Sequence, residues 1–251
     1  MSDQFIDLMI KEIELRNLDE KTRRAYLRSM EFFLEHFSRP PEELELNDLK
    51  DYQIYLLKKR GLAPNSVNRH LSAIKFFYMH VLNRYWYTIA LPRVRAPKKI
   101  PVILSEGEIA TMIDSVHNVM YKAIIMLMYS AGLRNEEVRL LKTVDIDSKR
   151  MVIDVRDGKG HRDGQAILAQ MTLRCLRTYW RLFRRNRKRT DSDWLFVASK
   201  AKDGQLDRHL SHTAVGYVVR MALKASGIKK KLPRTSFVIP SPCISLSVES
   251  I

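Results

Sequence analysis

The sequence predicts a mostly α-helical protein of two domains, the first all-α and the second mainly helical α+β with a small antiparallel sheet. Apolar residues recur at helical spacing through the first part of the chain, a basic proline-rich segment interrupts them, and two short segments further on alternate with the period of strands. With 251 residues, 45% of them hydrophobic, the chain is long enough to bury a core in each of two modest domains.

Residues 1–90 read as four helices with short connections. The second apolar stripe ends at Arg39-Pro-Pro41, because proline cannot continue a helix. A third helix runs from about Leu46 to Lys59 and stops at Gly61, and a fourth begins after Ala63-Pro64-Asn65. No strand pattern occurs in this part, so we expect a small all-α bundle.

Residues 91–102 contain three prolines and four cationic residues. Proline lacks the amide hydrogen that a helix interior needs, and the cations repel one another. We therefore expect an extended basic linker and a domain boundary here.

Residues 103–231 are expected to form the second domain. A capping-box pattern at Ser105–Glu108 opens its first helix, and helical spacing continues to Leu141. The period then changes, since Met151–Val155 and Gln165–Leu168 alternate as strands do and flank a glycine-rich turn. Helical spacing returns afterwards, which makes this domain α+β.

The charge of the chain is strongly positive. Lys and Arg number 44 against 28 Asp and Glu, which gives a formal net charge of +16 and a sequence pI of about 9.9. Such an excess is typical of proteins that bind a polyanion, and the partner we expect is double-stranded DNA. A ribosome-associated, RNA-associated or membrane-surface protein can carry a similar excess, so charge alone leaves these classes open.

Other signals exclude several classes of protein. Cys175 and Cys243 lie far apart without metal-ligand spacing, which favours a reducing, cytoplasmic environment. No run approaches the roughly 18 apolar residues of a membrane span. His209 and His212 have no Glu or Cys partner at ligand spacing, so surface or capping roles are favoured. Motifs of nucleotide, serine and zinc-dependent hydrolysis are absent, and we expect no cofactor and no metal.

The first candidate site residue is Arg134. An apolar helix breaks at Gly132, and Arg134 then stands at the head of the next helix. A guanidinium there can bind a phosphate bidentately beside the free N–H groups of a helix start. Glu137 lies one turn further on, where it can hold the arginine in position. An ordinary surface arginine between two helices is the alternative.

The second candidate is Lys159, in the glycine-rich turn Asp157–Gly164 between the two expected strands. A lysine at a hairpin tip can swing toward a bound phosphate or a leaving oxygen and act as a general acid or a charge stabiliser. A solvated turn explains the same residues, since Gly, Asp and Lys are common in hairpins.

Further cationic and polar residues stand near the starts of two expected helices. Segment Thr22–Tyr26 opens the second helix and Ser66–His70 opens the fourth, in places that suit contact with backbone phosphates. Helix capping is the alternative for Thr22 and Ser66. The residues expected to contact DNA are Thr22, Arg24, Asn68, Arg69 and Lys75.

Together these features resemble the tyrosine recombinases, the family of phage and transposon integrases. The resemblance covers most of residues 1–231 and rests on the helical first part, the linker, the Ala-Gly-Leu-Arg134-x-x-Glu137 motif and the Gly-Lys159-Gly hairpin. It implies a SAM-like core-binding domain over residues 1–90. It also implies that Arg134 is the first catalytic arginine, which grips the scissile phosphate, and that Lys159 protonates the leaving hydroxyl. Strand exchange in this family needs no ATP and no metal, and other recombinase protomers on DNA are the implied partners.

The family's remaining motifs are missing from this sequence. Family members continue with a His-x-x-Arg motif and then the nucleophilic tyrosine. Where Thr-Pro-His-x-Leu-Arg-His is expected, the chain reads Leu232-Pro-Arg-Thr-Ser-Phe-Val-Ile239, and no tyrosine follows Tyr217. Residues 232–251 also shift in composition, with one Arg, one Glu, three Pro and five Ser.

A reading-frame change explains this tail. If the frame moves back by one nucleotide, the codons of residues 233–251 permit Thr-Pro-His-Ile-Leu-Arg-His-Ser-Phe-Ala-Met-His-Leu-Phe-Glu-Arg-Gly-Val-Asp. That string resembles the family's His-x-x-Arg helix, and the preceding lysine codons, Lys229 to Lys231, offer an A-rich slip site. We therefore expect residues 232–251 to be a frameshifted tail after a truncated catalytic domain. A coding sequence without His-x-x-Arg in that frame would refute this.

We therefore predict that the chain is a DNA-binding member of a family that carries out site-specific recombination and integration of mobile DNA. We also predict that this chain does not cleave DNA. Whether it is still an enzyme is left open. The alternatives are a non-catalytic DNA-binding protein that competes at recombination sites and an unstable remnant. A basic RNA-associated protein is disfavoured because the aromatic stacking motifs of such modules are absent.

Overall fold

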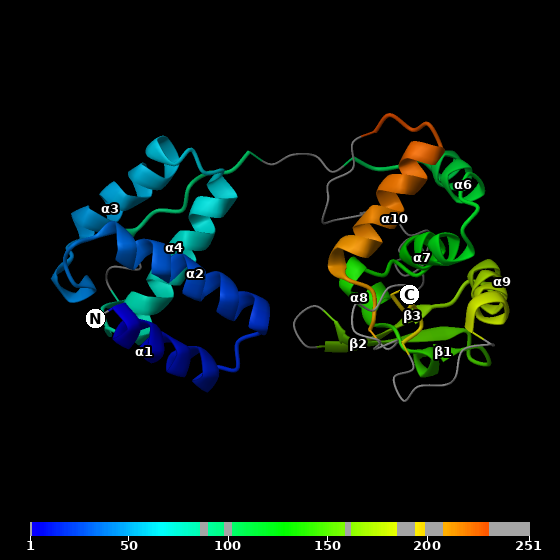
Figure 1. Ribbon diagram of the computed structural model, residues 1–251, viewed down its shortest axis with the longest axis horizontal. Coiled ribbons are helices and arrows are strands. Elements are labelled where there is room, and N and C mark those ends of the chain that lie inside the picture. The colour runs from blue at the N-terminus through cyan, green and yellow to red at the C-terminus, as the bar shows by residue number, and fades with distance from the viewer. Residues whose placement is uncertain are drawn as a thin grey trace, which may run out of the picture. The chain divides into compact units, whose positions relative to one another are not determined.

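The computed structural model describes residues 2–85, 90–97, 102–158, 162–184, 194–198 and 208–230 (Figure 1). The chain divides into two compact units, Met1–Lys99 and Ile100–Ile251. Each unit has a hydrophobic core of its own.

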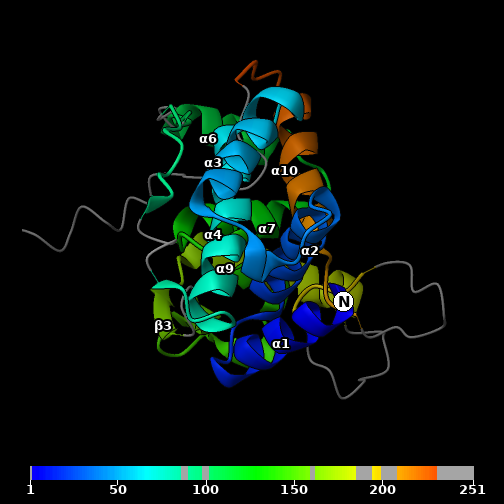
Figure 2. The same cartoon turned by 90° about the vertical axis from the view of Figure 1, so that its left-hand side faces the viewer.

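The first unit is all-helical in its described part, as the sequence predicts (Figure 2). Its α-helices are α1 (Ser2–Leu15), α2 (Glu20–His36), α3 (Leu46–Ile54) and α4 (Pro64–His80). A π-helical turn, Tyr55–Lys59, extends α3, and Gly61 follows shortly after it with a φ of +60°, which glycine readily adopts. Phe33, Leu56 and Phe77, all fully buried, pack together in the core of this unit.

Helix α2 begins earlier than the sequence suggested. Asp19 is its N-cap, and the Asp19 carboxylate accepts hydrogen bonds from the backbone N–H groups of Lys21 and Thr22, each at 2.9 Å. The Thr22 hydroxyl donates to the same carboxylate at 2.7 Å. The prediction that the helix opens at Thr22 was therefore wrong by two residues, because aspartate caps a helix at least as well as threonine.

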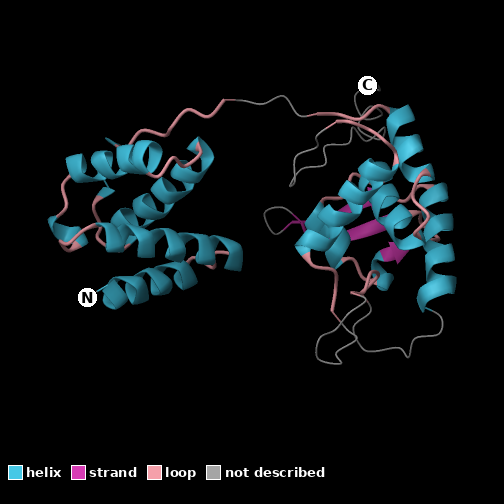
Figure 3. Cartoon of the chain, turned by 45° about the horizontal axis from the view of Figure 1, so that its top comes forward, coloured by secondary structure: helices cyan, strands magenta, loops and turns pink. Residues whose placement is uncertain are grey.

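The second unit combines helices with a small sheet, and the strands of Figure 3 lie among its helices. Its elements are α6 (Glu106–Asp114), α7 (Val119–Ser130), α8 (Asn135–Leu140), a 3₁₀ turn (Thr143–Asp145), β1 (Ile146–Asp147), β2 (Val152–Gly158), β3 (Arg162–Ile167), α9 (Gln170–Tyr179) with a π-helical turn (Trp180–Arg184), and α10 (His212–Ala225). The capping box predicted at Ser105–Glu108 is present at the start of α6. No described helix is long and apolar enough to cross a membrane.

The sheet is antiparallel in the order β1-β2-β3. Strand β2 pairs with β3 through Val152–Ile167 and Asp154–Gln165, so the two predicted strands are confirmed. Strand β1 was not predicted, since its two residues are too few to show an alternating pattern.

The core of the second unit joins segments that are distant in the sequence. Its fully buried side chains include Ile124 of α7, Val138 of α8, Ile153 of β2, Val215 of α10, and Phe196 in the segment between α9 and α10. Each such side chain contributes about 1.5–3 kcal/mol of burial free energy. The start of α10 and the segment around Phe196 are thereby held against α8, the helix that follows Arg134.

Candidate functional site

Arg134 is placed by the turn between α7 and α8. Helix α7 ends at Ser130 with Ala131 as its C-cap, and Gly132 then reverses the chain with a φ of +65°, a conformation that favours glycine. Leu133, only 4% exposed, anchors the turn in the core. Arg134 follows as the N-cap residue of α8, with its side chain 66% exposed.

Glu137 makes the contact with Arg134 that the spacing predicts. Its Oε1 lies 2.8 Å from Arg134 Nη1, and its Oε2 accepts the backbone N–H of Arg134 at 2.7 Å. The Glu137 side chain is 9% exposed, so a nearly buried carboxylate fixes an exposed guanidinium. A guanidinium has five N–H donors, and most of those of Arg134 stay available for a planar anion such as a phosphate.

The helix start itself contributes less than expected. The sequence suggested that free N–H groups at the head of α8 would assist Arg134. The structure shows that the N–H of Arg134 is occupied by Glu137 and that α8 spans six residues. The capacity to bind an anion here rests on the guanidinium.

Lys159 lies outside the described residues, as do residues 232–251. The strand that leads to Lys159 is described, because β2 reaches Gly158, and β3 begins again at Arg162. Strand β2 packs against α8. The role predicted for Lys159 stays a prediction.

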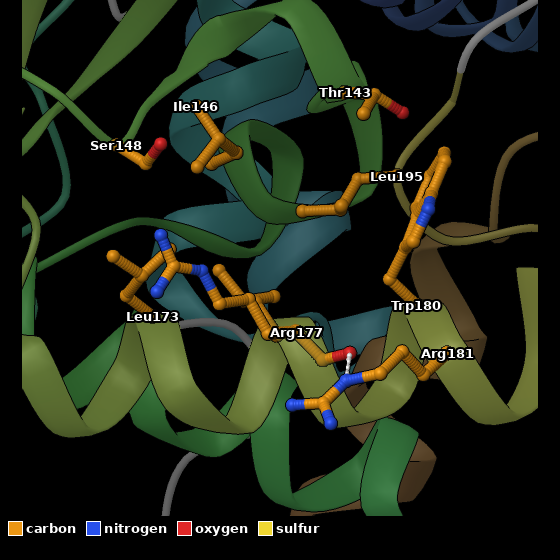
Figure 4. A pocket seen from close by; sticks show the side chains of 9 residues that line it. Thr143, Ile146, Ser148, Leu173, Arg177, Trp180, Arg181 and Leu195 are labelled. Carbon is orange, nitrogen blue, oxygen red and sulfur yellow. Dashed lines mark hydrogen bonds between the residues drawn. The ribbon is translucent and has the colours of Figure 1, made fainter.

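A cavity of about 270 Å³ lies between α9 and the β1 region (Figure 4). The apolar part of its lining includes Ile146, Leu173 and Leu195. Arg177 of α9 and Arg181 of the following π-helical turn also line the cavity. Its lining holds no carboxylate, histidine or cysteine, and we assign no chemistry to it.

Two histidines lie beside α8. A ring nitrogen of His209 is 3.1 Å from Arg139 Nη1, and its ring meets Trp194 edge-on at 5.1 Å. His212 Nε2 lies 3.8 Å from Glu136 Oε1. Among the described residues no group of three His, Cys, Asp or Glu side chains could hold a metal ion.

In the first unit, the structure gives local partners to most residues that were expected to contact DNA. Arg24 Nε lies 3.0 Å from Glu20 Oε1 on the same helix, and Thr22 is bonded to Asp19. Asn68 and Lys75 bond to the chain segment that follows α4. Arg69 is exposed, and the described residues include no ion-pair partner for it. Contact with DNA stays a prediction for all of these residues.

Residues 91–94, expected to belong to a linker, are bound to the first unit. We call this segment the strap. Leu91 is buried, and Val94 packs against the same core. Four hydrogen bonds hold the strap, namely Gln53 Nε2 to Pro92 O (3.0 Å), Asn68 Nδ2 to Val94 O (2.9 Å), Val94 N to Asn68 Oδ1 (2.9 Å) and Lys75 Nζ to Leu91 O (2.8 Å).

The strap yields a prediction. Asn68→Ala removes both hydrogen bonds to Val94 and is expected to lower the stability of the first unit by about 1–2 kcal/mol. Hydrogen exchange of a peptide covering residues 90–96 should accelerate, as mass spectrometry can measure. Asn65→Ala, an exposed change in the first turn of the same helix, is the control and should leave that peptide unchanged. Equal exchange in Asn68→Ala and the wild type would contradict the strap.

A group of cations that the sequence did not reveal surrounds Phe32 and His70, and we call it the arginine cluster. Arg28 and Arg60 lie 5.8 Å and 4.9 Å from the centre of the Phe32 ring. Burial lowers the pKa of His70, and the positive charges of Arg60 and Arg69 lower it further. No carboxylate pairs with these three arginines among the described residues. Uncompensated positive charge of this kind is suited to a phosphate backbone.

Comparisons with known proteins agree with these two units. Residues 5–88 match the model described as "Phage integrase, N-terminal SAM-like domain", and residues 103–237 match "Phage integrase family". The chain is 35% identical over 223 residues to a putative integrase/recombinase, y4qK, of Sinorhizobium fredii, covering 88% of this chain and 69% of that protein. A second protein of that organism, y4eF, is 40% identical over 155 residues, covering 61% of this chain and 59% of the relative.

Solved structures show the same fold. The Tn1549 transposon integrase, in complex with circular intermediate DNA, superposes with a TM-score of 0.67 at 17% identity, covering 92% of this chain and 82% of that one. A lambda integrase tetramer bound to a Holliday junction gives a TM-score of 0.68 at 14% identity, with 92% and 68% covered.

Proposed function

The chain belongs to the phage integrase family, and we propose that its 251 residues bind double-stranded DNA at recombination sites and leave it uncut. The observation that carries this proposal is the exposed guanidinium of Arg134, fixed by the nearly buried carboxylate of Glu137. In this proposal Arg134 grips the phosphate at the exchange point, and Lys159 is the hairpin lysine near the leaving oxygen.

The arginine cluster supports a second DNA contact, on the first unit. Arg28, Arg60 and Arg69 carry charge that no described carboxylate neutralises. Neutralising a phosphate with such a cation releases condensed counterions, which favours binding without base readout. A chain with cations on both units therefore has a binding surface on each.

The sequence supports binding without cleavage. Covalent recombination needs an activated nucleophile, and the family's tyrosine follows a His-x-x-Arg motif that residues 228–251 do not contain. Tyr217, the last tyrosine, lies on α10 and meets Tyr121 edge-on at 6.5 Å. We propose that residues 232–251 are read from a shifted frame, and sequencing the coding DNA through this region decides between the frames.

A folded protein that competes for recombination sites on DNA is the better interpretation of this chain than an unstable remnant. The second unit has a continuous buried core that includes residues from α6 to α10. Lys230, beyond α10, is still attached, since its Nζ lies 2.8 Å from Glu108 Oε2 at the start of α6. Such a chain can occupy DNA beside recombinase protomers of the same family without exchanging strands.

A salt titration tests the binding proposal. Fluorescence anisotropy with a labelled 30-base-pair duplex should show log Kobs falling linearly with log salt concentration. Arg134 and the three arginines of the cluster predict a slope of about −3.6 or steeper, at about 0.9 for each phosphate contact. No binding at 50 mM salt, or a slope near zero, would contradict the proposal.

A further inference from the structure

Arg156 of β2 repeats the arrangement of Arg134. Its side chain is 61% exposed, and its Nε lies 2.9 Å from Oδ1 of Asp145, whose side chain is 3% exposed. The Arg134 and Glu137 side chains are 66% and 9% exposed. In each pair a carboxylate that is buried or nearly so holds an arginine whose side chain is mostly exposed.

A second contact fixes the position of the Asp145 carboxylate. Its Oδ2 accepts the backbone N–H of Lys142 at 2.8 Å, which fixes the carboxylate within the 3₁₀ turn. Its Oδ1 is buried and accepts no directed hydrogen bond from any described residue, so the contact with Arg156 is ionic. The carboxylate thus positions Arg156 by charge, and the N–H donors of the guanidinium remain for another acceptor.

The two carboxylates that anchor the arginines line the same cavity. This cavity, of about 180 Å³, lies between α8 and β2, and its wall includes Glu137, Asp145 and Arg156. Lys142 adds a further positive charge to the wall, with its Nζ 5.2 Å from the centre of the Trp194 ring. The remaining acid of the wall, Asp154, accepts a hydrogen bond from Gln165 at 2.8 Å.

The strand is irregular where Arg156 occurs. The pairing of β2 with β3 is regular up to Val155–Gly164 and shifts before Gly158–Arg162, so two residues of β2 face one of β3. A bulge of this kind redirects a side chain, and bulges are frequent next to active sites. Arg156 is the first residue of the irregular stretch.

We infer that Arg156 binds a second DNA phosphate, next to the phosphate that Arg134 holds. This inference rests on the proposed function, because it assumes that the face of α8 and β2 meets DNA. B-form DNA carries one negative charge per about 1.7 Å of axis, so a neighbouring phosphate is always close to the first. Arg156 lines the cavity, and Arg134 is held by Glu137 of its wall. Two guanidinium groups anchored to one wall suit such a pair of phosphates, since each can bind one phosphate bidentately.

The competing explanation is that the Asp145–Arg156 pair only fastens β2 to the 3₁₀ turn. Three variants separate the two roles. Arg156→Gln removes the cation, Asp145→Asn removes the anchor while keeping an acceptor for Lys142 N, and the double variant leaves no buried charge unpaired. Arg150→Gln is the control, because Arg150 is an exposed arginine of the same sheet region and its guanidinium approaches Gln165 Oε1 at 3.5 Å.

The readout is the salt slope of binding to the 30-base-pair duplex. Arg156→Gln and the double variant should each reduce the slope by about 0.9, so the affinity ratio of wild type to variant shrinks about 3.5-fold between 50 and 200 mM salt. Asp145→Asn should weaken binding with the wild-type slope, because the charge remains but is no longer held. Arg150→Gln should keep the wild-type slope.

Two results overturn the inference, and they differ. If the wild type binds with a steep slope and the double variant has the same slope, Arg156 meets no phosphate and the pair is a structural fastening. If the wild type shows no salt-dependent binding, the proposed function fails and the inference fails with it. Thermal unfolding of each variant shows whether it is folded when its slope is measured.

Discussion

Replacing Arg28, Arg60 and Arg69 together by glutamine is expected to reduce the salt slope of DNA binding by about 2.7, at about 0.9 for each lost phosphate contact. Between 50 and 200 mM salt the ratio of wild-type to variant affinity should then shrink about 40-fold. The reason is that these arginines have no described carboxylate partner and so can release counterions when they neutralise phosphates. Anisotropy titrations at four or more salt concentrations measure the slope.

A matched control separates the cluster from net charge. Arg16, Arg23 and Arg39 also lie on the first unit, but each is paired with a carboxylate of that unit. Their joint replacement by glutamine changes the net charge by the same amount and should reduce the slope much less. If both triple variants lose the same slope, overall charge and not the arginine cluster governs binding.

The local parts of the fold and site could be predicted from the sequence. The Gly132 turn, Arg134 as the residue that heads α8 and its contact with Glu137 follow from spacing within a few residues. The capping box of α6 follows in the same way, because a helix start is decided by side chains within one turn.

Contacts between distant segments could not be predicted in this way. Arg60 reaches the Phe32 ring through tertiary packing that joins the end of a π-helical turn to α2. Asp145 and Arg156 lie in different elements, and nothing in the sequence pattern pairs them. Asn68 and Lys75 hydrogen-bond to backbone groups of the strap, which their positions in the sequence did not indicate, and their contact with DNA stays a prediction. A polar side chain near a helix start therefore identifies a possible donor, while tertiary packing decides which acceptor it meets.

The second large effect concerns cleavage, and we expect none. A tyrosine recombinase joins its tyrosine to the DNA 3′-phosphate, and this product survives denaturation. Arg134 is available to bind the phosphate, but residues 228–251 carry no His-x-x-Arg motif. Binding a phosphate without a nucleophile stabilises the bound state and breaks no bond.

The most direct test is therefore an assay in which the protein is incubated with nicked DNA that would trap a covalent protein–DNA product. Duplexes that the chain enriches from a random-sequence pool are nicked so that cleavage releases a short fragment, and the reaction is resolved on a denaturing gel. We predict retained binding under native conditions and no denaturation-resistant protein–DNA band. A band that appears with the wild type and disappears in a tyrosine-to-phenylalanine variant, Tyr217→Phe first, would contradict the claim that the chain holds DNA without cutting it.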